Sequence, residues 1–378
     1  MTNSAPFLEM HVMSRTLPTV LGLLALLVSA TPHADAANLW GLKQGRADLA
    51  SATTLAMGPD DILFVGDAKA ATVFAIATGD TKGDPASSSI HVHELPQAVA
   101  KALGATEAVI NDLAVNPRTG TAFLAAEVDG QPAIVKVDGT SAISRVPLES
   151  VHFSKAVLGD APADEVVGEG PRARNRRSDS ITDLAFFENK LLVSGLRSAL
   201  ASSTVRELAF PFAEWDDGVA VEIYHAAHGR DEDNAAMRTF VPLMIDGQPT
   251  IVGAYVCTPL VKIPVKSLSE AGDRVKGTTV AELGNRNRPL DMVSYEKDGV
   301  GYLLLSNSAR GVMKIPTAGL ENAESLTEPV RGGGTAGQGF ETVEAFQGVV
   351  QMDRLNETMV LVLVEADGRQ DLHAEMLP

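Results

Sequence analysis

Three aspartates occupy the same place in three copies of one short pattern, and they are the first residues that could do chemistry. The stretch Ile110–Gly120 (INDLAVNPRTG) returns from Ile181 (ITDLAFFENK) and from Pro289 (PLDMVSYEKDG). In each copy an Asp precedes a few apolar residues and a polar turn, and the three are Asp112, Asp183 and Asp291. If the copies are repeats of one structural unit, these carboxylates converge on one region of the fold.

Converging carboxylates repel one another unless a positive charge neutralises them. Together with Asn111 and a water molecule, they would suit Ca²⁺, Mg²⁺ or another divalent cation. Arg238 and Arg288 offer a second solution, because each could form a bidentate ion pair with a carboxylate. In a third interpretation each Asp only caps its own turn and ties neighbouring units together. The sequence leaves these interpretations open, along with an acid–base role for the aspartates.

Two histidines and the one cysteine are the other candidates for chemistry. His225 and His228 precede the acidic run Asp231–Asp233, so they could act as a general base or bind a transition metal, unless the loop is simply exposed and acidic. Cys257 stands in an apolar run, GAYVCTPL. A buried structural thiol fits that setting, and a nucleophile would also need a base and positive surroundings.

The charge and the missing motifs exclude several functions. The formal net charge is −17, which argues against nucleic acid as a partner, because phosphate backbones require a basic surface. The sequence contains no haem attachment motif, phosphate-binding loop or dinucleotide fingerprint. We therefore expect neither a haem nor a nucleotide cofactor.

The first 36 residues are typical of a secretory signal peptide. Arg15 precedes an apolar run, and Ala34–Ala36 offers a small-residue cleavage site; translation could start at Met1 or at Met13. We expect an exported protein, periplasmic or extracellular, that has no membrane span after cleavage. A single cysteine cannot form an intrachain disulfide, so the core must stabilise the fold alone.

Residues 37–378 are predicted to form a single all-β domain, a six-bladed β-propeller of four-stranded blades. Short apolar strands separated by turn residues recur about every 45–55 residues, a spacing typical of propeller blades. The predicted blades span about 53–95, 111–148, 182–225, 238–284, 289–330 and 341–377. The last has only three strands, so we expect the N-terminal strand Asn38–Leu49 to close it and to leave no free edge.

One face of this propeller carries the unusual residues. Loops between blades and turns between second and third strands lie on the same face, and they include the candidate ligand-binding residues Arg238, Asn285, Arg288, Asn307 and Arg310. The long loop Glu149–Ser180 adds four arginines, Arg172, Arg174, Arg176 and Arg177. It could receive an anion, cover the face as a lid, or remain a solvated insertion.

The run Asp112–Leu124 (DLAVNPRTGTAFL) resembles the blades of the NHL and senescence-marker-protein/gluconolactonase-like six-bladed β-propellers. In the lactonase-like members a divalent ion is held by Glu, Asn and Asp residues at strand starts. The resemblance implies that Asn111 takes the Asn position. Blade one has Ala52-Thr53-Thr54 where an acidic residue is expected, and in blade five Leu290 stands where the ligand would fall.

Two functions follow. The protein could bind a small molecule on the decorated face and hydrolyse a lactone or ester, supported by a divalent metal at Asn111, Asp112, Asp183 and Asp291, while His225 or His228 handles protons. Alternatively, it could be a non-catalytic propeller that docks a partner protein or ligand on the same face. The sequence does not decide whether the protein is an enzyme, and we expect it to be a monomer.

Overall fold

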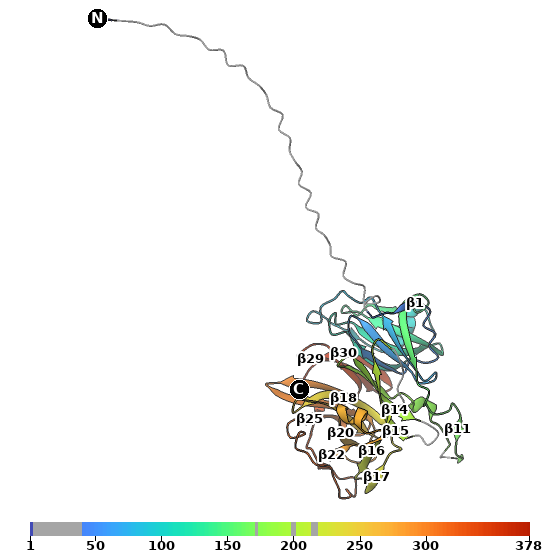
Figure 1. Ribbon diagram of the computed structural model, residues 1–378. Helices are drawn as coiled ribbons and strands as arrows, with labels where there is room; N and C mark the ends of the chain where they lie inside the picture. Colours follow the sequence, from blue (N-terminus) through green and yellow to red (C-terminus); the bar gives the residue numbers. More distant parts are fainter. Residues whose placement is uncertain (3–39, 171–172, 198–201, 213–217) are drawn as a thin grey trace. The chain divides into compact units, whose positions relative to one another are not determined.

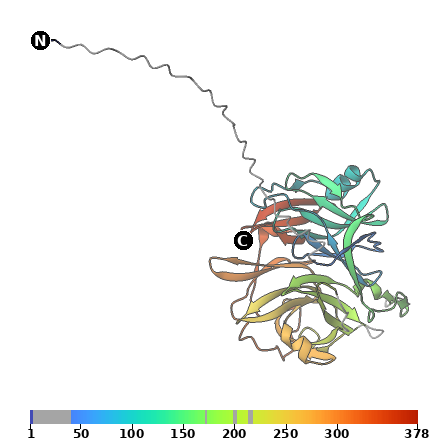
Figure 2. The ribbon, with the colours of Figure 1, turned by 45° about the horizontal axis from the view of Figure 1, so that its top comes forward.

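The computed structural model describes residues 1–2, 40–170, 173–197, 202–212 and 218–378. Residues Ala36–Pro378 form one compact unit. This unit contains six sheets arranged as the blades of a β-propeller (Figure 1 and Figure 2), which confirms the predicted fold class. Apart from its first two residues, the predicted signal peptide lies outside the described residues. Within the described part of the chain, no helix is long and apolar enough to cross a membrane.

We number the blades in the chain order of their innermost strands and give each from the axis outward. Blade 1 contains β2 (Thr54–Met57), β3 (Ile62–Asp67), β4 (Thr72–Ala77), β10 (Val151–Val157) and β1 (Lys43–Gly45). Blade 2 contains β6 (Ala108–Val115), β7 (Ala122–Val128), β8 (Gln131–Val137) and β9 (Ile143–Arg145). Blade 3 contains β13 (Asp183–Phe187), β14 (Lys190–Arg197), β15 (Ser202–Ala209) and β16 (Val219–His225), with β17 (Arg230–Glu232) and β21 (Arg274–Lys276) both paired to β16.

Blade 4 contains β18 (Met237–Ile245), β19 (Gln248–Tyr255), β20 (Pro259–Pro264), β22 (Thr278–Glu282) and β26 (Ala336–Gly337). Blade 5 contains β23 (Pro289–Lys297), β24 (Val300–Asn307), β25 (Gly311–Pro316) and β27 (Glu341–Thr342). Blade 6 contains β28 (Val349–Arg354), β29 (Met359–Ala366), β30 (Arg369–Met376) and β5 (His91–Val92). The other elements are the hairpin β11 (Val166–Val167) and β12 (Arg174–Asn175), the helices α2 (Leu95–Leu103) and α3 (Val265–Glu270), and the 3₁₀ turns η2 (Arg177–Asp179) and η3 (Glu344–Phe346).

Each blade is buried on both faces because it packs between two neighbours. Strand β3 illustrates the consequence, since all six of its residues are buried and five of them run without polar interruption, ILFVG. Continuous apolar runs of this kind are typical of strands covered on both sides. Six apolar clusters fill the spaces between the blades, one cluster for each neighbouring pair.

The blades do not follow one another around the axis in sequence order. The innermost strands touch in the order β2, β6, β28, β23, β18, β13 and again β2. The spatial order is therefore blade 1, 2, 6, 5, 4, 3, and blade 1 lies between blades 2 and 3. The chain builds three strands of blade 1, passes to blade 2, and then returns to add β10 to blade 1 before it enters blade 3.

This order corrects the predicted closure. The fourth strand of blade 6 is β5, which pairs with β30 at Val92 and Leu372, and Asn38–Leu49 does not supply it. From the described part of that stretch, β1 adds to the outer edge of blade 1 by pairing with β10. A strand does form within the predicted stretch, but in a different blade. An edge strand pairs through its backbone, so its side chains do not identify the partner sheet.

Two further strand assignments were wrong for the same reason. The predicted fourth strand of blade 1, near His91, belongs to blade 6, and β10, inside the predicted loop Glu149–Ser180, takes its place. The predicted fourth strand of blade 5, within the range 289–330, is replaced by β27, which pairs with β25 at Lys314 and Glu341.

Candidate functional site

Six equivalent positions at the start of the innermost strands form a ring around the axis, which we call the axial ring. In spatial order they are Thr54, Asp112, Gln351, Asp291, Thr239 and Asp183. Four of them follow the same β-bulge in their strand, so their register is the same. The predicted convergence of the aspartates is therefore observed, and they alternate with neutral residues.

Each ring aspartate ties its blade to the next one. Asp112 accepts a hydrogen bond from the backbone N–H of Leu55 at 2.6 Å. Asp291 accepts one from Met352 at 2.7 Å, and Asp183 accepts one from Phe240 at 2.8 Å. In every case the donor is the residue after the ring position of the neighbouring blade, so the repeated Asp is an interblade clasp.

Further donors surround these carboxylates. Asp183 and Asp291 each also accept the N–H of the following residue. The amide nitrogen of Gln351, in the orientation that satisfies its neighbours, donates to Asp291 at 3.0 Å and to Asp112 at 2.8 Å. Asp353 repeats the clasp one step further along the axis, because it accepts the N–H of Val115 at 2.7 Å.

Burial raises the pKa of all four carboxyl groups, and repulsion from neighbouring carboxylates adds to it for Asp112, Asp183 and Asp291. Burial is the larger cause in each case, and it raises the pKa of Asp183 to about 7 and that of Asp353 to about 6. The pKa values of Asp112 and Asp291 are raised well above the usual range by burial and by the neighbouring carboxylates. The ring therefore favours protons or another positive charge near neutral pH.

The structure does not support the alternative in which Arg238 neutralises the ring. Arg238 forms an ion pair with Asp179 at 2.7 Å instead of with a ring carboxylate. Arg288 is also attracted to the charge of Asp179. The Asn111 amide nitrogen donates to the carbonyl of Ala52 at 2.9 Å. A divalent cation at the ring stays a prediction, because a carboxylate keeps acceptor positions beyond the backbone N–H groups that it already binds.

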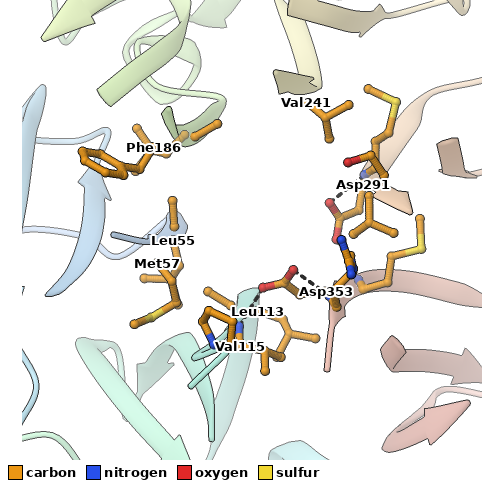
Figure 3. A pocket seen from close by; sticks show the side chains of 18 of the residues that line it. Leu55, Met57, Leu113, Val115, Phe186, Val241, Asp291 and Asp353 are labelled. Atoms are coloured by element: carbon orange, nitrogen blue, oxygen red, sulfur yellow. Dashed lines mark hydrogen bonds between the residues drawn. The ribbon is translucent and has the colours of Figure 1, made fainter. Parts of the chain in front are cut away.

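The ring separates two cavities along the axis. On the side where the innermost strands end, a cavity of about 640 Å³ has mostly apolar walls, including Leu55, Met57 and Phe186. Figure 3 shows this cavity with Asp291 and Asp353 on its wall. On the other side, a polar cavity of about 210 Å³ leads from the ring to Arg238 and Arg288.

Arg238 and Arg288 also line a third cavity of about 500 Å³, which we call the arginine cavity. Its other arginines are Arg174, Arg176 and Arg230. The acidic groups in its lining are Asp179 and Glu232, so positive charge is in excess. Burial and the charge of Arg238 lower the pKa of Arg288, which shows that the two guanidinium groups repel one another. An anion between them would relieve this repulsion.

The predicted catalytic residues meet in the same cavity. His225, His228 and Cys257 all line it, and one ligand atom from each lies within 4.8 Å of the others. His225 ends β16 and His228 lies in the tight turn to β17, so both come from blade 3. Cys257 comes from the turn between β19 and β20 of blade 4. The rings of the two histidines are in contact, with centroids 3.8 Å apart and planes tilted by 36°.

Glu232 holds both imidazoles. Its carboxylate accepts a hydrogen bond from Nδ1 of His225 at 2.8 Å and from Nδ1 of His228 at 3.0 Å. Arg230 donates to the same carboxylate at 2.8 Å. Burial alone would raise the pKa of Glu232, but these hydrogen bonds outweigh it and the pKa is lowered. Because a carboxylate only accepts, both Nδ1 atoms carry a proton, and the free position of each neutral ring is Nε2.

His225 has the properties of a base. It is 1% exposed, and burial lowers its pKa and favours the neutral ring near pH 7. Its Nε2 has no hydrogen-bond partner among the described residues. A neutral imidazole with a free Nε2 can accept a proton from water or coordinate a metal ion.

The remaining predicted ligand-binding residues lie elsewhere. Arg310 reaches the carbonyl of Gly333, and Asn285 lies against the same glycine. Asn307 is buried at the end of β24, where its amide donates to the carbonyl of Leu305 at 3.1 Å. None of these three lines the arginine cavity as the structure describes it. Their role in binding stays a prediction, and Arg172 lies outside the described residues.

Sequence reasoning did not identify three residues that organise these sites. Glu232 and Asp179 hold the histidines and Arg238, and Gln351 bridges two ring aspartates. Glu232 was noted only as part of an acidic run. The available signal was its spacing after the histidines in HAAHGRDE, a stretch that forms a hairpin with polar residues at its turn. No sequence signal pointed to Gln351, because a Gln at that position departs from the repeated Asp.

Comparisons with known proteins do not assign this chain to a family. No family model matches the sequence, and no curated protein matches it. Similar solved structures include a protein assigned as a 6-phosphogluconolactonase from Bacteroides uniformis, with 8% identity over 85% of this chain and 76% of that chain and a TM-score of 0.35. They also include the PQQ-bound aldose sugar dehydrogenase of Streptomyces coelicolor, with 11% identity over 88% of this chain and 97% of that chain and a TM-score of 0.30.

The extracellular region of plexin A4 is similar as well, with 8% identity over 89% of this chain and a TM-score of 0.43. This chain spans 51% of the length of that structure. Likenesses this weak carry no argument about activity. The function must be argued from the site itself.

Proposed function

We propose that the protein is an exported, monomeric propeller that binds a small anionic molecule in the arginine cavity and hydrolyses a lactone or ester bond in it. One observation carries the proposal. His225, held at Nδ1 by Glu232 and with Nε2 free, lines the same cavity as the arginines. The convergence of a proton acceptor and an excess of cations would serve the hydrolysis of an anionic substrate.

The cavity selects for negative charge. A protein of net charge −17 has little reason to gather arginines in one cavity unless they meet an anion. The guanidinium fork binds carboxylate or phosphate groups through paired hydrogen bonds. The volume of about 500 Å³ falls within the range of small-molecule sites, roughly 300–1,000 Å³. A carboxylated or phosphorylated lactone or ester therefore fits in both size and charge.

The chemistry requires an activated water molecule and a stabilised oxyanion. A water at Nε2 of His225 would lose its proton to the imidazole as it attacks the carbonyl carbon, and Glu232 would stabilise the imidazolium that forms. Arg238 or Arg288 would stabilise the oxyanion of the tetrahedral intermediate. The imidazolium then returns the proton to the leaving oxygen. Water bound to a metal ion at the same place would supply the same nucleophile.

Hydrolysis of a panel of lactones and esters, each with and without a carboxylate or phosphate group, tests the proposal. We expect activity on the anionic members, and loss of it in His225→Ala. Arg310→Ala is the matched control, because it removes an arginine that does not line the cavity. Anion binding without hydrolysis of any member would overturn the enzyme and leave a binding protein.

A second candidate, docking of a partner protein, is favoured by the hairpin β11–β12. Val166 and Val167 are 68% and 59% exposed there, next to Arg174 of the paired strand. Exposed valines beside an arginine resemble the composition of a protein interface. Pull-down with wild-type protein and with Val166→Ser/Val167→Ser distinguishes this function, since only docking requires the valines.

A further inference from the structure

The cluster of His225, His228 and Cys257 has the arrangement of a metal-binding site. One ring nitrogen of each histidine and the Sγ atom of Cys257 lie within 4.8 Å of one another. In a tetrahedral zinc site, bonds of about 2.0–2.3 Å place ligand atoms roughly 3.5 Å apart. Small side-chain rotations would bring the three atoms to that spacing.

Glu232 supports this arrangement on the far side of the rings. Metal-binding histidines almost always donate their other N–H to a carboxylate, carbonyl or water, which fixes the tautomer and aims the free nitrogen. Glu232 does this for both rings at once, with Nδ1 distances of 2.8 and 3.0 Å. A single carboxylate therefore fixes the tautomer of both rings and leaves both Nε2 positions for a ligand. A general base alone would require only one of these hydrogen bonds.

Two buried polar atoms beside the cluster have no hydrogen-bond partner in the part of the chain that the structure describes. Nε2 of His225 has none, although the residue is 1% exposed. Oε1 of Glu282 also has none, and its other oxygen accepts the N–H of Ala227, between the two histidines, at 3.0 Å. Buried polar atoms are normally paired, so an unpaired nitrogen and an unpaired carboxylate oxygen together are suited to binding a cation.

The backbone presents Cys257 to the histidines in an uncommon conformation. Cys257 and Thr258 have φ values of 65° and 62°, in the left-handed region that few non-glycine residues adopt and β-branched residues avoid. Hydrogen bonds hold this turn, from the Cys257 N–H to the carbonyl of Asn287 and from the Thr258 hydroxyl to the carbonyl of Gly284. Strain of this kind persists where the surrounding structure enforces it, often at functional sites.

We propose that His225, His228 and Cys257 bind a transition-metal ion of the zinc class, with the fourth position open to the arginine cavity. Thiolate and imidazole ligands select zinc-like ions over Ca²⁺ or Mg²⁺, so this site is distinct from the cation predicted at the axial ring. Three protein ligands and one open position are typical of catalytic zinc. The site also joins blade 3 to blade 4. The proposal that a metal binds here is argued from the cluster alone. Only the proposal that this metal takes part in hydrolysis rests on the proposed function.

Absorption spectroscopy of the metal-free full chain titrated with Co²⁺ tests the site. We expect a thiolate-to-cobalt charge-transfer band that saturates at one equivalent and disappears in Cys257→Ser. Because the sequence contains a single cysteine, the band can come only from this position. A wild-type protein without the band would overturn the proposal, and so would a band that persists unchanged in both His225→Ala and His228→Ala.

Two controls keep the result specific. All titrations use a His91→Ala/His93→Ala background, because these exposed residues have Nε2 atoms 2.9 Å apart and could bind Co²⁺ on their own. Glu232→Gln keeps the size of the side chain but weakens its hold on the imidazoles, and we expect about a 10–100-fold loss of Co²⁺ affinity. A melting curve of each variant separates loss of the site from loss of the fold.

The outcomes separate this inference from the proposed function. A saturating band in a protein that hydrolyses no substrate supports the metal site and overturns the enzyme. Hydrolysis that continues in metal-free Cys257→Ser supports His225 as the base and overturns the catalytic part of the inference. Hydrolysis restored to chelated wild-type protein by Zn²⁺, but not to Cys257→Ser, supports both.

Discussion

The axial ring and the arginine cavity both gather charged side chains, but they treat them differently. In the ring, backbone N–H groups and the Gln351 amide bond the carboxylates, so Asp112, Asp183 and Asp291 act as clasps between blades. In the arginine cavity, like charges face one another, and the buried Nε2 of His225 has no partner among the residues that the structure describes. Carboxylates that bind backbone N–H groups of the next blade are typical of a structural role, although the ring hydroxyl of Thr54 has no hydrogen-bond partner among the described residues. An unpaired histidine nitrogen beside an excess of arginines indicates a ligand.

The two regions also differ in how often their residues occur along the chain. The ring uses one position in every blade, which is why it appears in the sequence as a repeat. The histidine–cysteine cluster occurs once and combines a hairpin of blade 3 with a turn of blade 4. In a propeller, repetition therefore identifies what holds the blades together, and residues that break the repetition identify the candidate site.

The largest effect is expected for His225. His225→Ala should lower the hydrolysis rate by about 10²–10⁴-fold, because it removes a proton acceptor or a metal ligand from the reacting water. Steady-state kinetics on the anionic substrate measure the loss. His91→Ala, an exposed histidine far along the chain, is the control and should keep full activity. Equal activity in His225→Ala and His91→Ala would show that the arginine cavity is not the site of hydrolysis.

Asp291 tests the structural side of the comparison. Asp291→Ala leaves the N–H groups of Met352 and Met292 without their acceptor. Each unsatisfied group costs about 1–3 kcal/mol, and relief of carboxylate repulsion offsets part of it, so we expect a loss of about 2 kcal/mol. Chemical denaturation measures it. Asp291→Asn keeps an acceptor oxygen and should lose less than half as much.

A stable Asp291→Ala variant with reduced hydrolysis would contradict the structural role of the ring. It would show that the carboxylate serves the reaction instead of the blade contact, as expected if the ring holds a catalytic divalent ion.

The arginines are expected to have a moderate effect that the ring variants do not share. Arg238→Ala should weaken binding of an anionic ligand about tenfold, or about 1.4 kcal/mol, the lower end for a hydrogen bond to a charged group. Isothermal titration calorimetry measures the affinity, and Arg310→Ala is the control. The loss should shrink at high salt, because the interaction is between charges. A ligand that binds both variants equally well would place the anion site elsewhere.

Part of this architecture could be predicted from the sequence. The pattern DLAV at Asp112 and its later copies indicated the blades and the ring, because strand periodicity and turn residues are local properties. The order of the blades around the axis could not be predicted. Strands β5 and β10 pair through their backbones with sheets built far away in the sequence, and side-chain pattern does not encode that choice.

The candidate site divides in the same way. His225, His228 and Cys257 were each singled out by residue type and by their positions at the ends of strands. Their meeting in one cluster is a finding of the structure that the sequence did not predict. Arg238 was one of the alternatives considered for neutralising the ring. It binds Asp179 instead, because proximity to a strand start does not fix the direction of a long side chain. Asn285, Asn307 and Arg310 share the expected loops without lining the cavity.

The smallest expected effect is a pH dependence of stability that originates in the ring. Burial raises the pKa of Asp183 to about 7, against about 4 in an unfolded chain. The folded protein therefore holds a proton that the unfolded chain has lost, and its contribution to stability is complete below about pH 4 and disappears as the pH rises through about 7.

Asp183 lines both axial cavities and is only partly buried. Solvent screening therefore reduces the effect, and we expect a change of only about 1 kcal/mol between pH 5 and pH 8, which corresponds to less than one pKa unit. Asp183→Asn cannot titrate, and its stability relative to wild type should rise over that interval, as measured by denaturation at each pH. A divalent cation at the ring would compete with the proton. In that case Ca²⁺ should abolish the pH dependence of wild-type stability and leave the stability of Asp183→Asn nearly unchanged. Parallel pH profiles for the two proteins would contradict the prediction. They would show that Asp183 is ionised throughout and that the ring is neutralised by other means.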